Sequence, residues 1–180
     1  MSSSIKKMMT YKDCLVHEMN TLAENPRVFF LGQQVAEGDF YGTLKDIPSD
    51  RRIEMPVAEE MQMGISIGMA LEGLCPVSIY QRMDFLPRAM DQIVNHLNLI
   101  ERLSKGRFSP KVIIRTTIGA TKPLHPGLQH AKDLIKGFQS MVDFPVLDLK
   151  TQKDIAAGYK LARESARSIM LVERQELYDI

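Results

Sequence analysis

The chain has 180 residues and a formal net charge of +1, with 44% hydrophobic and 25% charged residues. These values are typical of one soluble globular domain with a full hydrophobic core. Because acidic and basic residues are interspersed, the charge pattern indicates neither a nucleic-acid partner nor a membrane surface. The longest apolar run, residues 64–80, contains Glu72 and Pro76, so no segment is expected to span a bilayer.

Cysteine usage and the N-terminal segment bear on the cellular compartment. Cys14 and Cys75 are too few and too isolated for a disulfide framework, and no metal site is predicted. The first residues lack the long apolar core of a secretory signal. We therefore expect a cytoplasmic protein, with residues 1–9 as a flexible N-terminal extension.

Short apolar runs alternate with longer helix-like segments along the chain. Most of the short runs are continuously apolar, as expected for parallel strands that are covered on both faces. This order predicts an α/β fold with three layers: a central, mostly parallel sheet of about six strands, and helices on both faces. In chain order the predicted elements are helix 10–24, strand 27–32, strand 52–55, helix 58–73, strand 75–80, helix 86–105, strand 111–117, helix 128–142, strand 144–149, helix 151–166 and strand 168–173.

Two long loops follow predicted strands. One covers residues 32–51, and the other covers residues 117–130 and carries glycines, prolines and two histidines. Both are expected at the carboxyl edge of the sheet, where open parallel sheets usually bind their ligands. Long loops in compact domains are also more often functional than short ones.

Two adjacent acids, Glu59 and Glu60, stand at the expected start of helix 58–73, just after Pro56. Carboxylates in a first turn stabilise a helix by about 0.3–1 kcal/mol, and this interpretation needs no further function. The rest of the helix is almost entirely apolar, which predicts burial of the whole helix, its first turn included. A buried carboxylate is costly without a partner, so a specific role for one acid is the second interpretation. The residues alone leave both open.

Motifs along nearly the whole chain, all in one order, resemble those of a known family. They are "NPRVFFLG" (25–32), "MPVAEE" (55–60), "IGMALEGLCPV" (67–77), "MDFLPRAMDQIVNH" (83–96), "LSKGRFSPKVIIR" (103–115), "LQH" (128–130) and "LVERQELY" (171–178). The sequence is similar to the pyrimidine-binding domain of thiamine-diphosphate enzymes, above all to the beta subunit of the decarboxylating component of 2-oxo acid dehydrogenases. Transketolases share this domain more distantly.

The resemblance implies roles for five residues. Glu59 fits the family's Pro-x-x-acid spacing, so its carboxyl group is expected to bind the aminopyrimidine ring nitrogen and help activate thiamine diphosphate. Phe85 matches the aromatic residue that stacks on that ring, and His130 matches a loop histidine that acts on substrate or intermediate. Gln34 and Gln81 are candidate cofactor contacts, although the family keeps other residues there.

The resemblance also implies what a second polypeptide supplies. The family holds the diphosphate and its magnesium ion on another domain, through a Gly-Asp-Gly motif and a following Asn that this sequence lacks. We therefore expect residues 1–180 to be a single pyrimidine-binding domain, with neither a diphosphate-binding domain nor a C-terminal transketolase-type domain. A companion subunit should hold the diphosphate and magnesium, in a homodimer or a two-plus-two heterotetramer.

Three functions agree with these motifs. The first is an enzyme subunit that acts with thiamine diphosphate on a 2-oxo acid or a ketose, as in a dehydrogenase component. The second is a transketolase-like or acyloin-forming subunit that makes carbon–carbon bonds. The loss of two family acids at Gln33 and Gln34 puts a dehydrogenase-type proton relay in doubt. The third is a non-catalytic binding or regulatory subunit, against which the retained Glu59 and Phe85 argue.

Overall fold

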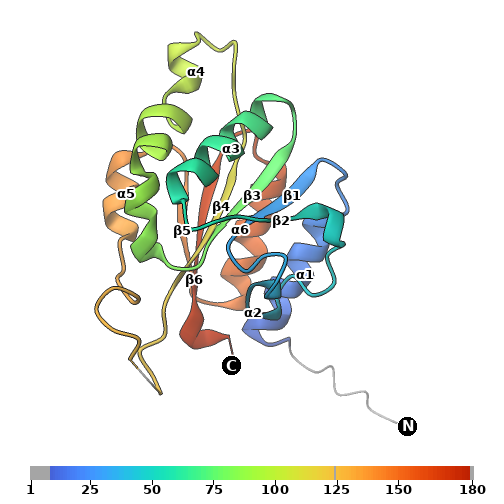
Figure 1. Cartoon of the computed structure of the whole chain (residues 1–180), viewed down its shortest axis with the longest axis vertical. Coiled ribbons are helices and arrows are strands. Elements are labelled where there is room, and N and C mark those ends of the chain that lie inside the picture. The colour runs from blue at the N-terminus through green and yellow to red at the C-terminus, as the bar shows by residue number, and fades with distance from the viewer. Residues whose placement is uncertain (1–8, 124, 179–180) are drawn as a thin grey trace.

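The structure is a computed structural model that describes residues 9–123 and 125–178. Within these residues, six parallel strands form one sheet in the order β2-β1-β3-β4-β6-β5 (Figure 1). The predicted three-layer α/β fold is thereby confirmed. The strands are β1 (Val28–Gly32), β2 (Arg52–Glu54), β3 (Cys75–Tyr80), β4 (Ile113–Ile118), β5 (Val146–Leu149) and β6 (Ile169–Arg174). The extension expected at residues 1–9 lies outside the described residues, except for Met9.

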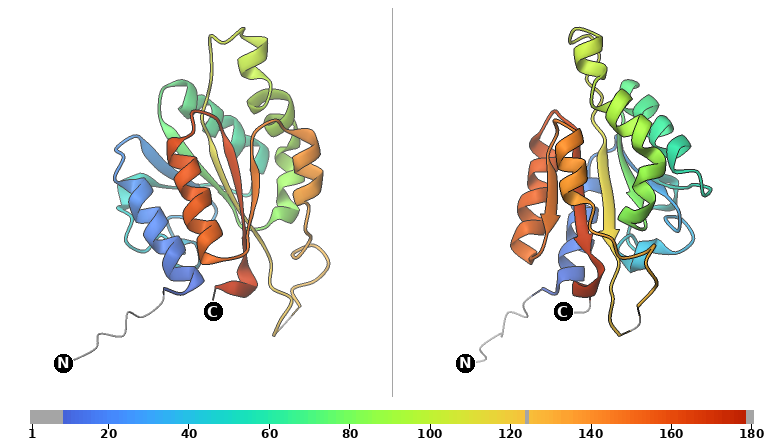
Figure 2. Two further views of the ribbon diagram at one scale, coloured as in Figure 1. Left: turned by 180° about the vertical axis from the view of Figure 1, so that it is seen from behind. Right: turned by 90° about the vertical axis from the view of Figure 1, so that its left-hand side faces the viewer.

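Alternate strand residues point to opposite faces of the sheet and build two cores. Ile113 and Leu171 belong to the core beneath helices α1 and α6, which lie side by side behind the sheet (Figure 2). Ile114 and Met170 belong to the second core, beneath α3, α5 and the segment 83–103. The helices are α1 (Tyr11–Ala23), α2 (Asp39–Gly42), α3 (Glu59–Leu71), α4 (Ile100–Leu103), α5 (Ile135–Met141) and α6 (Gln152–Glu164). Among the described residues, no helix combines the length and apolar character needed to cross a membrane.

Side-chain caps begin the two helices of the first face. The Thr10 hydroxyl accepts from the backbone N–H of Asp13, and the Asp13 carboxylate accepts from the backbone N–H of Thr10. Thr151 caps α6 in the same way, accepting from the N–H of Asp154 at 3.2 Å. Both caps satisfy N–H groups that a helix leaves without partners, so these starts could be read from the sequence.

The predicted continuous helix 86–105 is wrong. The chain forms a 3₁₀ helix over Met83–Ala89, a π-helix over Gln92–Leu97 and then the single turn of α4. Pro87 lies inside the 3₁₀ helix, but a proline in a first turn is compatible with an α-helix, so Pro87 does not explain the break. Tight and wide turns of this kind are frequent near functional sites.

The predicted helix 128–142 is shorter than expected, since α5 begins only at Ile135. The Asp133 carboxylate accepts from the N–H of Ile135 at 3.1 Å and marks this later start. The N–H of Lys132 donates to Asp84 at 3.2 Å, which ties the end of the loop to the 3₁₀ helix. The loop after β4 therefore extends beyond residue 130 along the carboxyl edge of the sheet.

Candidate functional site

Glu59 is the first residue of α3, close to the carboxyl end of β2. Its side chain is only 4% exposed, and its Oε2 atom is buried without a hydrogen-bond partner among the described residues. The guanidinium Nε of Arg88 lies 3.5 Å from this atom, on a side chain that is 76% exposed. A buried carboxylate oxygen with one distant charged neighbour has unused capacity to accept a hydrogen bond from a ligand.

An open hollow of about 580 Å³ lies in front of Glu59. Its wall combines the two charged groups just described with exposed apolar side chains on α3 and just before it. Val57, Met61 and Ile65 are all more than one third exposed, and Gly64 adds no side chain to the wall. The hollow therefore suits a flat apolar group that also carries a polar atom.

Buried hydrogen bonds hold the start of α3 against the sheet. The Gln62 amide donates to the carbonyl of Ile79 at 2.9 Å and to the Ser78 hydroxyl at 3.1 Å. The Tyr80 hydroxyl donates to the backbone carbonyl of Glu59 at 3.4 Å. Burial raises the pKa of Tyr80, so this hydroxyl keeps its proton at neutral pH. These bonds fix the position of the Glu59 backbone.

Phe85 and His130 contact each other outside the lining of this hollow. Their rings are perpendicular, with centroids 5.6 Å apart, and the Nδ1 atom of His130 is buried without a hydrogen-bond partner among the described residues. Phe85 and Arg88 stand three positions apart in the 3₁₀ helix, where such side chains project on the same side. The pair formed by Phe85 and His130 therefore lies on the same side as Arg88 and Glu59.

A glycine allows the histidine loop to fold back on itself. A Cβ atom at Gly119 would lie 2.0 Å from the carbonyl oxygen of His130, so a larger residue would push the two ends of the loop apart. The sequence marked this loop as functional by its composition. It did not show which residue permits the close approach.

Gln34 and Gln81 are placed by their backbones. Gln34 is exposed and adopts a positive φ of 56°, with its N–H donating to the Glu54 carboxylate. Gln81 follows β3, and its carbonyl accepts from Arg82 Nη1 at 2.8 Å and from the Thr117 hydroxyl. Their roles as cofactor contacts stay predictions.

A second hollow, of about 460 Å³, lies at the carboxyl edge near the ends of β4 and β6. Lys12, Arg82 and Lys122 contribute positive charge to its wall. Arg82 Nη1 also donates to the Thr117 hydroxyl at 3.2 Å, and its Nε is buried without a hydrogen-bond partner in the described part of the chain. Sequence analysis missed this cationic group and Arg88, since residues so distant in sequence meet only in the fold.

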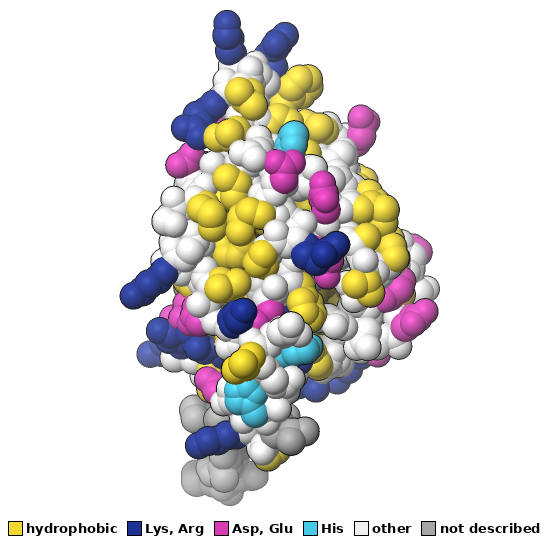
Figure 3. Space-filling model, turned by 60° about the vertical axis from the view of Figure 1, so that its left-hand side comes forward, with side chains coloured by type: hydrophobic (Ala, Val, Ile, Leu, Met, Phe, Trp, Pro, Cys, Tyr) yellow, Lys and Arg dark blue, Asp and Glu magenta, His cyan; other side chains and the backbone are white. Residues whose placement is uncertain are grey.

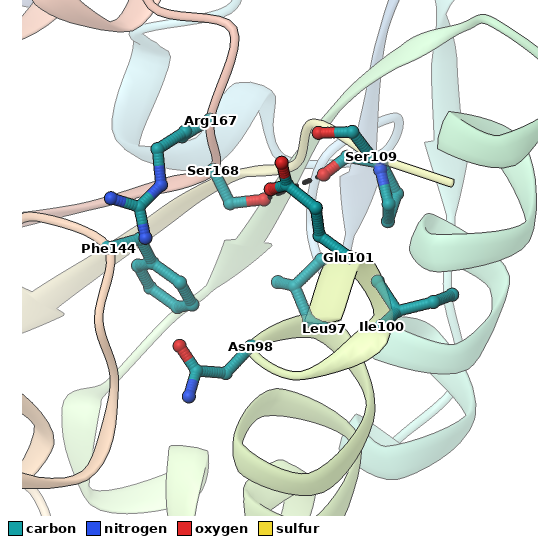
Figure 4. Close-up of a pocket in the computed structure, with 9 residues that line it drawn as sticks. Leu97, Asn98, Ile100, Glu101, Ser109, Phe144, Arg167 and Ser168 are labelled. Atoms are coloured by element: carbon teal, nitrogen blue, oxygen red, sulfur yellow. Dashed lines mark hydrogen bonds between the residues drawn. The ribbon is translucent and has the colours of Figure 1, made fainter. Parts of the chain in front are cut away.

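A small cavity at the opposite, amino edge of the sheet has a structural role (Figure 4). Its volume of about 30 Å³ admits no more than a few water molecules. Ser168 donates to the carbonyl of Pro110, and Asn98 accepts from the N–H of Asp143 at 2.7 Å. In the described part of the chain, no cluster of three or more His, Cys, Asp or Glu could bind a metal ion.

The fold and these polar side chains first indicate the class of protein domain. A parallel α/β sheet with polar side chains gathered around its carboxyl edge is a ligand-binding α/β domain. Residues 7–179 match the family described as "Transketolase, pyrimidine binding domain". The chain belongs to this family.

Similar proteins agree with this assignment. The pyruvate dehydrogenase E1 component subunit beta of Gracilaria tenuistipitata var. liui is 30% identical over 158 residues, which cover 85% of this chain and 48% of that relative. A chloroplastic subunit beta-4 of the same component from Oryza sativa subsp. japonica is 29% identical over 94% of this chain and 42% of its own length. The chain thus spans about half the length of the curated relatives it matches.

Solved structures share the fold. A structure titled "Split gene transketolase, inactive beta4 tetramer" has a TM-score of 0.70 and 19% identity, over 93% of this chain and 52% of the other. Transketolase from Leishmania mexicana has a TM-score of 0.70 and 14% identity, over 91% of this chain and 25% of the other. At these identities the likeness shows the fold alone.

Proposed function

We propose that this chain is the pyrimidine-binding subunit of a split enzyme that uses thiamine diphosphate to act on a 2-oxo acid or a ketose. The observation that carries the proposal is Glu59, whose buried Oε2 stands without a hydrogen-bond partner among the described residues at the wall of a hollow. The family assignment supplies the ligand class, because the matched domain is described by pyrimidine binding.

The residues around the hollow fit an aminopyrimidine ring. A carboxylate can share a proton with a ring nitrogen, and the apolar side chains of Val57, Met61 and Ile65 offer contact to its faces and methyl group. We assign Phe85, which is half-buried, to stacking on the aromatic ring of the ligand. This proposal assigns magnesium and the diphosphate to the companion subunit.

The chemistry divides between cofactor and protein. Bound thiamine diphosphate supplies a thiazolium carbon that, once deprotonated, adds to a substrate carbonyl. Glu59 holds the proton at the pyrimidine ring nitrogen, and the buried bonds of Gln62 and Tyr80 keep its backbone in place. His130, which has a free ring nitrogen, is the candidate for proton transfer to the substrate.

The cationic hollow at the carboxyl edge supports an acidic substrate. Three cationic side chains and one acidic side chain line this space: Lys12, Arg82, Lys122 and Glu176. The Arg82 Nε has no hydrogen-bond partner among the described residues. A carboxylate or phosphate group on the substrate would satisfy these donors. Both 2-oxo acids and phosphorylated ketoses carry such groups, so dehydrogenase-type and carbon–carbon bond-forming reactions stay alternatives within the proposal.

The exposed surface of α3 supports an assembly with further chains. Figure 3 shows hydrophobic side chains in several groups on one face, with acidic and basic side chains between them. On α3 the exposed apolar residues are Met61, Ile65 and Leu71, each at least 41% exposed. We propose a homodimer or a two-plus-two heterotetramer with the companion subunit. A stable monomer in sedimentation, both alone and mixed with the companion, would contradict this assembly.

The experiment compares Glu59→Gln with Glu60→Gln in the chain purified together with its companion subunit. Exchange of the thiazolium proton into deuterated water is followed by NMR after acid quench. We expect Glu59→Gln to lose about 10²–10⁴-fold in exchange rate, because an amide is nearly isosteric but cannot share its proton as a carboxyl does. Equal exchange in wild type and Glu59→Gln would reject the role of Glu59.

A further inference from the structure

We propose that Arg88 is a gate for the pyrimidine site. In the free chain its guanidinium lies beside the Glu59 carboxylate, where the ring nitrogen of the ligand would bind. The guanidinium must therefore move away when the ligand binds. This inference rests on the proposed function and adds a residue that competes with the cofactor. Arg88 has no catalytic role in this inference, because its side chain competes with the ligand for Glu59 and takes no part in the reaction.

The two partners of the contact between Arg88 and Glu59 differ in solvent exposure. Glu59 is nearly buried, whereas the Arg88 side chain is 76% exposed and reaches Oε2 from the solvent side, with Nε 3.5 Å away. At this distance the pair is an ionic contact without a strong hydrogen bond, because N–H···O bonds are normally 2.7–3.2 Å long. Arg88 thus neutralises the buried carboxylate without satisfying its hydrogen-bonding capacity.

Arg88 also lies in the path to Glu59. Both residues line the same open hollow, together with Val57, Ile65 and Gln92. A planar ligand that reaches Oε2 through this opening takes the space held by the guanidinium. The contact must therefore break before or during binding, and its free energy is subtracted from the binding free energy of the ligand.

The exposure of Arg88 keeps the cost of displacement small. Its charged end is already solvated, so it can swing into water on its flexible stem. Ion pairs with one exposed partner contribute little to stability, which sets the size of the competition at a few-fold in affinity. The α3 backbone need not move, because the bonds of Gln62 and Tyr80 hold it independently of Arg88.

The test measures binding of a pyrimidine probe to the full chain without its companion. The probe is 4-amino-5-hydroxymethyl-2-methylpyrimidine, and its affinity is read from backbone amide shifts of the ¹⁵N-labelled chain. Arg88→Gln is expected to bind the probe about threefold more tightly than wild type, the range expected for one half-solvated ion pair. Arg88→Lys, which keeps the charge, is expected to bind like wild type.

Two further variants make the result specific. Arg102→Gln removes an arginine that is also mostly exposed, at 67%, and ion-paired with Asp143, and should leave probe affinity unchanged. In a Glu59→Gln background, Arg88→Gln should no longer change affinity, because the contact to be released is gone. Equal or weaker binding by Arg88→Gln, with binding still dependent on Glu59, overturns the gate alone. No probe binding by any variant, Arg88→Gln included, overturns the gate together with the proposed function.

Discussion

Two glutamates with almost no solvent exposure lie in very different surroundings. Glu173, at the end of β6, is 0% exposed, and Glu59, at the start of α3, is 4% exposed. The Glu173 carboxylate receives two bonds from Arg115, one of them from Nη2 at 3.0 Å, and another from the Tyr159 hydroxyl at 2.9 Å. The Tyr178 hydroxyl also donates to it. Among the described residues, the Glu59 Oε2 has no hydrogen-bond partner and one charged neighbour, the Nε of Arg88 at 3.5 Å.

The surroundings of Glu173 form a closed network. Burial lowers the pKa of Arg115, but the charge and hydrogen bonds of Glu173 outweigh burial and raise that pKa overall. Burial and the charge of Glu173 raise the pKa values of Tyr159 and Tyr178, so both hydroxyls remain donors. Arg115 further donates to the Thr43 hydroxyl at 2.9 Å, which links the loop after β1 to the sheet.

Glu173 and Glu59 differ in how far the chain satisfies them. A buried charge is tolerated when hydrogen bonds satisfy it, and Glu173 meets that condition within the chain. Among the described residues, the Oε2 of Glu59 has no hydrogen-bond partner, and this is the reason for proposing Glu59 as the binding acid. Burial alone does not distinguish the two acids, whereas burial together with a missing partner does.

The largest expected change in stability comes from removing the counter-charge of Glu173. Arg115→Met should reduce the free energy of unfolding by about 3–5 kcal/mol, because it leaves Glu173 buried without its counter-charge. Urea unfolding followed by circular dichroism measures this change. Arg102→Met, which removes an exposed arginine paired with exposed Asp143, serves as a control and should cost less than about 1 kcal/mol. A similar small loss in Arg115→Met would show that the network is not a source of stability.

The fold was predictable from the sequence because its signals are local. Continuous apolar runs marked the buried parallel strands. The structure adds the threonine N-caps of α1 and α6, Thr10 and Thr151. The segment after β3 was not predictable, since its 3₁₀ and π turns depend on more than apolar spacing.

The candidate site was predictable in part. Glu59, Phe85 and His130 were proposed from motifs; the structure gives their positions, and their roles stay predictions. Arg88 and Arg82 carry no local pattern, because a solvent-exposed arginine and a functional one look alike in sequence. What distinguishes them is a tertiary contact: Arg88 to Glu59 and Arg82 to Thr117.

Asp148, whose side chain is 20% exposed, is a third ion-paired acid, and its effect on stability should depend on pH. Burial raises the pKa of Asp148, but the hydrogen bonds and charges of Arg174 and Lys150 outweigh it and hold that pKa below its ordinary value. A lowered pKa in the folded state adds stability above the unfolded value of about 3.9, and this stability is lost as the pH falls through the folded value. Arg174→Gln should therefore cost about 1 kcal/mol at pH 6 and much less near pH 2. Urea unfolding at the two pH values checks this, and an equal cost at both would contradict it.

Substitution of Glu59, the acid without a hydrogen-bond partner among the described residues, should change stability less. Glu59→Gln removes a buried charge and a weak ion pair together, so its effect on the free energy of unfolding of the free chain should stay below about 1 kcal/mol. The same substitution is expected to have a large effect on thiazolium proton exchange, so its effects on stability and on exchange should differ in size. A loss of several kcal/mol in urea unfolding would place Glu59 beside Glu173 as a structural residue.

The smallest expected effect belongs to Glu60, the exposed neighbour of Glu59 in the first turn of α3. Its carboxylate can interact with the N-terminal end of the helix dipole, which contributes about 0.3–1 kcal/mol at an exposed position. Glu60→Gln should therefore reduce the free energy of unfolding by no more than that, and it should leave thiazolium proton exchange within about twofold of wild type, because a group outside the proton transfer does not contribute to its rate. Both glutamates line the hollow, but Glu59 is buried and Glu60 is exposed, so this pair of variants separates the effect of burial from that of charge. If Glu60→Gln lost exchange and Glu59→Gln kept it, the motif would have to be shifted by one residue, and the buried carboxylate would serve the fold instead.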